Sequence, residues 1–548
     1  MSDDDDKTTA SLDVFILTFN AAKTHIDTST IAFHLRNAFD HNATDLPELV
    51  VICLQEMAPL AHSFIGSYMI NPYFQSWVSA VNLAASLPRG SPLPDQATQA
   101  LESENGSEDG SQDEAQDEAQ DETRDDLSSS ARSTPTRDSS PDSIKDEPGD
   151  SPYTLVATRH VGMTGILLLS RDPSALDDLK STEVGFGAGD MGNKGAVGLR
   201  MLFSKNDAKG RKRQTELTFV GAHLAAHEWN LDKRNRNWQS IVSGLRESPP
   251  PQHPSRDSTY SLRLVTVFED PKKLRGEKST WPTPGRFGST VEETQALLAR
   301  DPNEKEVHDI TIYKPGSHLF VAGDLNYRTS KTSPSPNSVF PDFDSKSPHY
   351  YLRFLAFDQL VLEQAAGRTL HGLGESQIDF PPTYKLDYKD DEATGAEFQA
   401  HRRGLPPAND VVSWMWATHR WPSWCDRVLY LNVPHSVGED VAIETIAYDA
   451  LPPVRTSDHR AVYLRLSVPV LEPSILAPSA EFRASNRDDP RVKLPYAIDF
   501  EAWDHRERVK KWEWIIGWSM LISQSKRGIA FFATLAFLGI GAWWLRSR

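Results

Sequence analysis

The sequence predicts an α/β fold in which short buried strands present polar side chains at their ends. Residues 50–54 (VVICL) run directly into Gln55 and Glu56, and residues 318–322 (HLFVA) run into Gly323 and Asp324. Short apolar runs that stop at polar residues are typical of buried strands. Because strand ends present side chains from a rigid sheet, Glu56 and Asp324 are expected to mark a functional site.

Length and charge predict one large domain with accessory segments. The chain has 548 residues, of which 39% are hydrophobic, and a formal net charge of −18. Residues 101–150 hold 17 acidic and 4 basic side chains, so they contribute −13 to the net charge and the rest of the chain contributes −5. This stretch is also rich in Ser and Gln and cannot bury enough apolar surface to fold. Residues 88–150 are therefore expected to be a disordered insertion, either a solvated spacer or an acidic tether that competes with an anionic ligand for a basic site.

The first residues and the cysteines indicate a reducing compartment. Residues 1–7 (MSDDDDK) have no apolar core, so they are not a secretory signal peptide, and the folded part is expected in the cytosol. Cys53 and Cys425 lie far apart in apolar or aromatic runs. Two buried free thiols are favoured over a disulfide or a metal site.

An ordered series of motifs carries a family resemblance. The chain contains, in order, Phe19-Asn20, Gln55-Glu56, 159–169 (RHVGMTGILLL), 189–197 (GDMGNKGAV), 223–227 (HLAAH) with Arg234-Asn235, 323–328 (GDLNYR), 382–385 (PTYK), 424–427 (WCDR) and 457–459 (SDH). Together they resemble the inositol polyphosphate 5-phosphatase family, fungal type. The resemblance covers residues 12–466 and implies a two-layered β-sandwich flanked by helices, related to metal-dependent endonucleases of the DNase I type. Two departures are Phe19, where the family has Trp, and Arg460-Ala461, where it has Lys-Pro.

Hydrolysis of a phosphate monoester requires a cation, a positioned water and donors that hold the transition state. The resemblance implies that Glu56 and Asn20 hold the metal. Oxygen ligands suit Mg²⁺, and no His/Cys cluster in the sequence has zinc spacing. The resemblance also implies that Asp324 orients or deprotonates the attacking water and that Asn326 donates to the phosphoryl oxygens.

Two histidine segments complete the implied catalytic set. The resemblance places His223, Asp458 and His459 at the scissile phosphate, with His459 as a candidate hydrogen-bond donor to it. Asp426 is expected to orient one of the two imidazoles, and the sequence leaves open which one.

Glycines and bases predict the phosphate-binding residues. In residues 192–195 (GNKG) the glycines allow main-chain N–H groups to approach an anion, beside Asn193 and Lys194. The P-loop spacing GxxxxGK[ST] is missing there, which argues against an ATPase. The resemblance adds four residues that hold the neighbouring phosphate or shape the inositol pocket, with Tyr384 and Lys385 expected at a 4-phosphate. The four residues are Arg328, Tyr384, Lys385 and Arg427.

The C-terminal part predicts membrane attachment. After a linker over 467–510, residues 511–548 are expected to form a membrane-associated tail. Residues 528–545 (GIAFFATLAFLGIGAWWL) are uncharged and would span roughly 27 Å as a helix, which suits a thin bilayer. We therefore expect a single-pass C-terminal anchor in an endoplasmic-reticulum-like membrane, with the catalytic domain on the cytosolic side. A hydrophobic hairpin with 512–522 is the alternative.

These features lead to a functional hypothesis. The sequence is interpreted as a membrane-anchored, Mg²⁺-dependent phosphoinositide 5-phosphatase that removes the 5-phosphate from phosphatidylinositol 4,5-bisphosphate or a related lipid. A 5-phosphatase of soluble inositol polyphosphates is the alternative. A DNase I-like nuclease is disfavoured, and no nucleic-acid partner is expected, because the chain outside the insertion is net negative. A catalytically inactive phosphoinositide-binding tether would lack Glu56, Asp324, Asn326 or His459, and all four are present.

Overall fold

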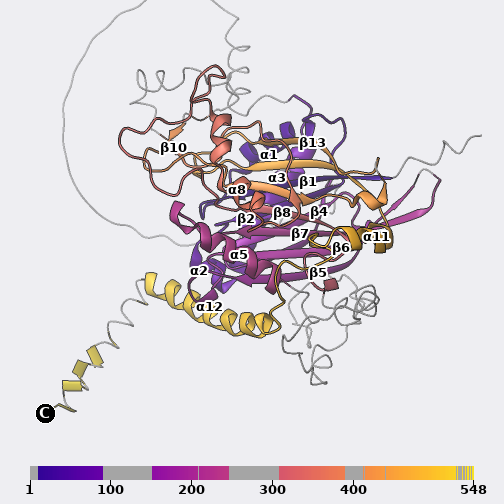
Figure 1. The fold of residues 1–548 in the computed structure, drawn as a ribbon. Coiled ribbons are helices and arrows are strands. Elements are labelled where there is room, and N and C mark those ends of the chain that lie inside the picture. Colours follow the sequence, from indigo (N-terminus) through magenta and orange to yellow (C-terminus); the bar gives the residue numbers. More distant parts are fainter. Residues whose placement is uncertain are drawn as a thin grey trace, which may run out of the picture.

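The computed structural model describes residues 10–90, 151–207, 209–245, 308–388, 412, 414–438 and 440–525, with scattered positions beyond 525. The described chain forms two six-stranded sheets with helices around them (Figure 1). The predicted α/β sandwich flanked by helices is therefore confirmed. Most of the expected insertion, residues 91–150, lies outside the described residues.

In the first sheet, β1 lies near the middle, between β14 and β2. β1 pairs with β2 in parallel, and the other neighbouring strands of this sheet are antiparallel. In spatial order the strands are β13 (Glu444–Ala450), β14 (Val462–Pro469), β1 (Ser11–Asn20), β2 (Leu49–Gln55), β4 (Thr164–Ser170) and β3 (Thr154–Val161).

The second sheet also has one parallel pair near its middle, β7 with β8, among antiparallel neighbours. In spatial order its strands are β5 (Leu176–Gly185), β6 (Gly195–Asn206), β7 (Lys212–His223), β8 (Ser317–Asp324), β12 (Asp426–Leu431) and β9 (Leu373–Gly374). A separate pair, β10 (Leu386–Tyr388) and β11 (Trp414–Trp416), is antiparallel.

The central strands are covered on both faces, which explains why β1, β2, β4 and β8 are mostly apolar and buried at nearly every position. In β1, Val14 and Ile16 belong to the core between the sheets, whereas Phe15 and Leu17 belong to the core under α1 (Thr28–Asp40) and α3 (Asn71–Ser86). The outer face of the second sheet packs on α5 (Leu231–Gly244) and α8 (Gln359–Ala365). The remaining short elements are α2 (Leu60–Ile65), α10 (Pro473–Leu476), α11 (Ala480–Ser485) and the 3₁₀ turns η2 (Ser67–Met69), η3 (Pro173–Ala175), η4 (Ala188–Asp190), η5 (Glu228–Asn230), η6 (Tyr351–Phe357) and η8 (His435–Val437).

The cysteines lie in these cores. Cys53 in β2 packs between the two sheets, and Cys425 directly precedes β12. Both are buried free thiols, and burial raises the pKa of each.

The predicted single-pass membrane anchor is not supported and is corrected here. Among the described residues, no helix is both long enough and apolar enough to cross a bilayer. The long helix of the C-terminal part is α12 (Ala502–Gln524), which bears charged residues and lies along the domain (Figure 1). Arg506 of α12 contacts Glu183 of β5 at 2.8 Å, and its Gly517 packs against α2. Most of residues 528–545, the predicted spanning helix, lie outside the described residues.

Residues that we expected to be a linker are partly regular. β14 continues to Pro469, α10 and α11 follow, and α12 begins at Ala502. The sequence pattern could not predict this, because the partners of these segments lie in distant parts of the chain.

Candidate active site

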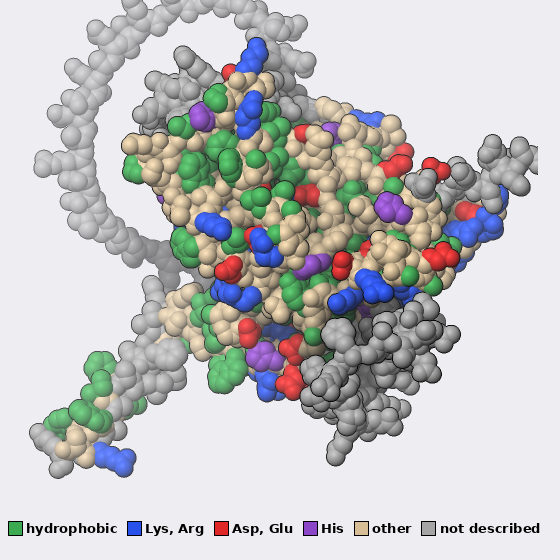
Figure 2. All heavy atoms as spheres, in the orientation of Figure 1, with side chains coloured by type: hydrophobic (Ala, Val, Ile, Leu, Met, Phe, Trp, Pro, Cys, Tyr) green, Lys and Arg blue, Asp and Glu red, His purple; other side chains and the backbone are tan. Residues whose placement is uncertain are grey.

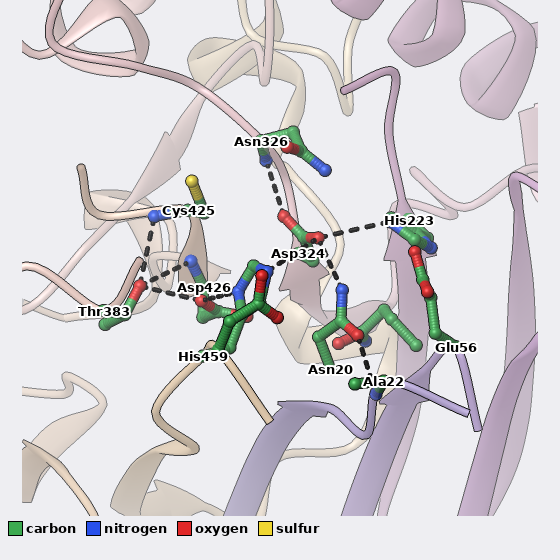
Figure 3. A network of polar contacts seen from close by, with 12 residues as sticks. Asn20, Ala22, Glu56, His223, Asp324, Asn326, Thr383, Cys425, Asp426 and His459 are labelled. Atoms are coloured by element: carbon green, nitrogen blue, oxygen red, sulfur yellow. Dashed lines mark hydrogen bonds and ion pairs between the residues drawn. The ribbon is translucent and has the colours of Figure 1, made fainter. Parts of the chain in front are cut away.

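The candidate active site lies where the carboxyl ends of the two parallel strand pairs meet (Figure 3). In the first sheet, Asn20 at the end of β1 is in register with Gln55 at the end of β2, and Glu56 follows directly. In the second sheet, His223 at the end of β7 is in register with Asp324 at the end of β8. Asn20 Nδ2 donates to Asp324 Oδ2 over 3.0 Å, so a side-chain hydrogen bond joins the two sheets at this edge.

Asp324 is the centre of the network and is buried. Its Oδ1 accepts from the backbone N–H of Asn326 at 3.1 Å, and its Oδ2 lies 3.2 Å from His223 Nε2 and 4.0 Å from His459 Nε2. Burial disfavours the charged carboxylate, but His459, His223 and Lys194 outweigh it and hold the pKa of Asp324 well below its usual range. Asp324 is therefore ionised and surrounded by donors.

A second carboxylate orients one of the two imidazoles. Asp426 Oδ2 lies 2.9 Å from His459 Nδ1, so the imidazole that Asp426 orients is that of His459 and not that of His223. Thr383 Oγ1 donates to the same Asp426 oxygen at 2.7 Å. Burial disfavours the imidazolium, but Asp426 and Asp324 outweigh burial and raise the pKa of His459 to about 9. His459 is thus a cation at neutral pH, with Nε2 directed toward Asp324.

Glu56 and Asn20 offer oxygen ligands in adjacent positions. The Glu56 carboxylate is held by Lys23 Nζ at 2.7 Å and lies 3.8 Å from Lys194 Nζ. Burial opposes ionisation of Glu56, yet His223, Lys194 and Lys23 together lower its pKa. Asn20 Oδ1 accepts from Ala22 N at 3.1 Å, which leaves this oxygen a second lone pair. A partly exposed carboxylate that already attracts cations, beside an amide oxygen, fits a hard divalent cation.

A further potential ligand group lies deeper. One ligand atom each from Asp324, Asp426 and His459 falls within 4.8 Å of the others. However, the hydrogen bond between Asp426 and His459 already uses one nitrogen and one oxygen of this group. The more open Glu56 side of the site therefore suits a cation better.

Arg328 and the Tyr384 ring pack together on one side of the site. Its guanidinium lies 4.3 Å from the centre of the Tyr384 ring, which in turn lies 4.5 Å from the His459 ring. Arg328 also donates to the side-chain oxygen of Asn326. Asn326 has a φ of 57°, a conformation that Asn tolerates better than most residues, and this turn keeps its amide beside Leu224 O at 3.3 Å.

Lys194 reaches into the cluster, whereas Asn193 does not join it. Lys194 Nζ contacts the His223 ring. Asn193 Oδ1 is buried and has no hydrogen-bond partner among the described residues. A Cβ on Gly192 would come within 2.6 Å of the Gly162 nitrogen, so this glycine is required for close backbone packing. Of the predicted phosphate-binding residues 192–195, Lys194 therefore lies at the site, whereas Gly192 allows close packing of the backbone.

Lys385 and Asp458 lie at the rim. They form an ion pair with each other. The side chain of Lys385 is 26% exposed and that of Asp458 is 32% exposed. Lys385 Nζ also lies 5.5 Å from the centre of the Tyr384 ring. Asp458 is therefore the partner of a base at the rim, while its neighbour His459 enters the central network.

Arg427 is placed away from the site, contrary to the expectation from sequence. Its side chain is fully buried and pairs with Asp358 at 3.0 Å and with Glu375. Burial alone would lower the pKa of Arg427, but the two carboxylates raise it well above its usual range. Arg427 therefore supports the second sheet and does not face a phosphate pocket.

Three supporting residues were not assigned roles from the sequence. Thr383 positions Asp426, and Ser457 Oγ donates to the backbone carbonyl of Asn20 at 2.6 Å while accepting from His459 N at 3.1 Å. Both stand inside the motifs PTYK and SDH, so their place in those motifs was the available signal. Lys23 stands in no motif, and only the fold brings it to Glu56.

Comparison with known proteins gives consistent matches. The family described as Endonuclease/Exonuclease/phosphatase family 2 matches residues 17–465. "Type II inositol polyphosphate 5-phosphatase 15" of Arabidopsis thaliana is 28% identical over 299 residues, which cover 54% of this chain and 22% of that protein. "Phosphatidylinositol 3,4,5-trisphosphate 5-phosphatase 1" of Mus musculus is 25% identical over 284 residues, covering 50% of this chain and 16% of that protein.

Among solved structures, the inositol polyphosphate 5-phosphatase domain of SPsynaptojanin, in complex with inositol (1,4)-bisphosphate and calcium ion, matches with a TM-score of 0.43 and 18% identity. The match covers 87% of this chain and 92% of that one. The chain spans about a fifth of the length of the Arabidopsis relative and less of the mouse relative.

Proposed function

The chain belongs to the Endonuclease/Exonuclease/phosphatase family 2, and from that premise we propose that it is a divalent-metal-dependent inositol polyphosphate 5-phosphatase. The observation that carries the proposal is the meeting of Asn20, Glu56, His223, Asp324, Asn326 and His459 at one edge of the sandwich. These residues combine a carboxylate for a cation, a buried carboxylate for a water, and donors for a phosphoryl group. The printed names of the plant and mouse relatives support the same reaction class.

In this proposal Glu56 and Asn20 hold a divalent cation, which would neutralise charge on the phosphoryl oxygens when bound; Mg²⁺ is the ion that an oxygen ligand set favours. Asp324 holds the attacking water. Because its neighbours keep its pKa far below neutrality, Asp324 is a weak base, so its part is to orient the water more than to remove a proton.

The remaining residues bind the phosphate that is cut. His459, kept protonated by Asp426, directs Nε2 toward the oxygen that carries charge in the transition state. Lys194 and His223 approach from the second sheet, and Asn326 donates its amide. Lys385 and Tyr384 at the rim would contact a neighbouring 4-phosphate, for which a partly exposed ammonium is suited. A substrate contact of Asn193 stays a prediction, since its side-chain oxygen is buried and has no hydrogen-bond partner among the described residues.

The substrate that we propose is a phosphoinositide lipid, phosphatidylinositol 4,5-bisphosphate or a related one. The lipid in the printed name of the mouse relative supports this choice. The alternative is a soluble inositol polyphosphate, which the printed name of the Arabidopsis relative supports. On the face drawn in Figure 2, Lys and Arg side chains are interspersed with Asp and Glu, whereas a nucleic-acid backbone calls for a row of basic side chains.

An activity panel tests the proposal. The full chain would be assayed for phosphate release from phosphoinositides in vesicles and from soluble inositol polyphosphates, with Mg²⁺ and with a chelator. We expect release of the 5-phosphate that stops with the chelator and is fastest on a 4,5-bisphosphate lipid. A matched control is Asp324→Asn, which keeps the shape of the side chain and should slow turnover by about 10²- to 10⁴-fold with little change in Tm. Turnover of soluble substrates alone would favour the alternative, and no release from either class would refute the proposal.

A further inference from the structure

The C-terminal helix α12 supplies a buried carboxylate to the loop that carries Lys194. Glu513 Oε1 accepts a hydrogen bond from the backbone N–H of Gly192 at 2.6 Å, across 321 positions of sequence. The Glu513 residue is 4% exposed. Gly192 lies in the segment between η4 and β6 that was expected to bind phosphate through its main-chain N–H groups. One of those N–H groups is therefore taken by the protein's own carboxylate.

From Gly192 a short chain of backbone hydrogen bonds leads to the proposed metal ligand. The Gly192 carbonyl accepts from Met163 N at 3.0 Å, and the Met163 carbonyl accepts from Met57 N at 3.1 Å. Met57 directly follows Glu56, whose φ of 44° marks a strained turn for a side chain of this kind. Gly192 is thus held at its N–H by α12 and at its carbonyl by Met163, which in turn binds the residue that follows Glu56.

The Glu513 carboxylate is paired as well as buried. Arg506, two turns earlier on the same face of α12, donates to both of its oxygens at 2.7 Å. Arg506 also donates to Glu183 Oε1 in β5 at 2.8 Å. A buried ion pair of this kind gains little net stability, because desolvation of the charges offsets their attraction. Its geometry does fix the carboxylate in one place, facing the Gly192 N–H.

Close packing of α12 sets the distance. A Cβ on Gly517 would lie 3.0 Å from Ala61 O, from Ile65 Cγ1 and from Phe64 Cβ of α2, so the helix approaches α2 as closely as a glycine allows. α2 begins four residues after Glu56. α12 therefore contacts the two segments that carry Lys194 and Glu56 into the site.

We propose that Glu513 is a positioning residue, which holds the Gly192 peptide so that Lys194 stays against His223 and Glu56. The expected effect of Glu513 on substrate binding rests on the function proposed above, whereas its effect on the mobility of the loop depends only on the contacts described here. Since Lys194 is placed to bind the substrate phosphate, loosening the loop should weaken substrate binding more than it slows the chemical step.

Three full-length variants separate this role from general stability. Glu513→Ala removes the acceptor, Glu513→Gln keeps an oxygen that can accept from Gly192 N, and Glu507→Ala is a control on the exposed side of the same helix, where Glu507 pairs with Lys510 at 2.9 Å. Amide hydrogen exchange would be measured on peptides that cover residues 186–195, with β7 as reference. We expect Glu513→Ala to speed exchange in residues 186–195 at least about tenfold, Glu513→Gln to restore most of the protection, and Glu507→Ala to change nothing.

Kinetics supply the second readout. Glu513→Ala should raise KM about tenfold and lower kcat by less than threefold, with recovery in Glu513→Gln. If Glu513→Ala does not fold, Gly517→Leu, which should lift α12 from α2 with Glu513 intact, must give the same fast exchange and raised KM. Unchanged exchange over residues 186–195 in a folded variant would overturn the contact, and fast exchange with an unchanged KM would overturn the positioning role. An inactive wild type would overturn the proposed function, and the exchange comparison would still decide the role of Glu513 in holding the loop.

Discussion

Asp324 contacts residues from both sheets, and its negative charge acts on the two imidazoles beside it. It accepts from Asn20 and Asn326 and stands between two imidazoles, His223 and His459. In a buried site with this many donors, a change at one residue alters the ionisation of the others. The pH dependence of the reaction should therefore report on the pair formed by His459 and Asp426.

We predict that the rate falls on the alkaline side as His459 loses its proton. Burial lowers and the two carboxylates more strongly raise the pKa of His459, to about 9, so the imidazolium is present below that pH and is lost as the pH rises through it. Asp426→Asn removes the closest negative charge and should move the descending limb of the pH profile of kcat to lower pH. An unchanged limb in this variant would show that another group controls it.

Two substitutions at the metal side should have opposite effects. Glu56→Gln removes the proposed carboxylate ligand and should weaken the apparent affinity for Mg²⁺, with partial recovery when Mg²⁺ is raised roughly 50-fold. Lys23→Met removes the ammonium that lies 2.7 Å from the same carboxylate, so this variant should bind Mg²⁺ with a higher apparent affinity. The measurement is phosphate release as a function of Mg²⁺ concentration. If neither variant shifts that curve, Glu56 does not hold the cation.

Lys385→Ala distinguishes the neighbouring phosphate from the one that is cut. A lost charge-assisted contact of about 1.5–3 kcal/mol should lower kcat/KM about 10- to 100-fold on substrates with a 4-phosphate. Substrates without that phosphate should be affected much less. Equal losses on both kinds would mean that Lys385 contacts the scissile group or supports the rim through Asp458.

At this scale the sequence predicted residue types better than their partners. Asp324, Asn326, Glu56 and His459 were expected together, and the structure brings them to one edge. That Asp426 pairs with His459 could not be predicted, because it depends on the register of β12 against β8 and on a turn beyond β14. Arg427 was expected at the site because it stands in the motif WCDR, yet adjacent residues of a strand point to opposite sides, and Arg427 points away from Asp426 toward Asp358 and Glu375.

The strands are the elements that the sequence predicted well. Residues 50–54 and 318–322 lie in β2 and β8, because a strand covered on both faces is apolar at every position and stands out in the sequence. Strand order was not predictable, since it depends on pairings between distant segments. The single-pass anchor was predicted wrongly from the apolar run 528–545, because among the described residues no helix is long and apolar enough to cross a bilayer. The helical part of the expected linker was not predicted either, since the partner of Arg506, Glu183, lies in a distant part of the chain.

A buried histidine in β8 should make the stability of the sandwich depend on pH. His318 lies in the core region with Nε2 at 3.1 Å from Pro469 O of β14, and burial lowers its pKa to about 4. The unfolded chain, with a usual pKa near 6.5, binds more protons than the folded one between these values, so stability is complete above about pH 6.5 and falls until about pH 4. The loss from this residue is on the order of 3 kcal/mol.

His318→Gln tests this element. Gln can donate to the same carbonyl and does not titrate, so its free energy of unfolding should fall less between pH 6.5 and 4 than that of the wild type. The measurement is chemical denaturation at a series of pH values. Parallel curves for the two proteins would contradict the assignment to His318.

The whole fold depends on contacts between its first and last strands, β1 and β14. β1 lies between β14 and β2, so the first sheet is complete only when a strand from the end of the domain has been inserted beside the first one. Asp13 of β1 and Arg465 of β14 form an ion pair across 452 positions of sequence. Contacts at such separations make folding slow, because a long loop must close before they form.

This arrangement has a consequence during synthesis. At roughly 5–20 residues per second, a ribosome needs on the order of half a minute or more to reach β14 after it has made β1. Throughout that time the apolar strand β1 lacks one of its two neighbours, and an unpaired apolar edge is a site of aggregation. Nascent chains that stop before Val462 should therefore depend on chaperones and be degraded, even though every residue of β1, β2, β7 and β8 has already been made.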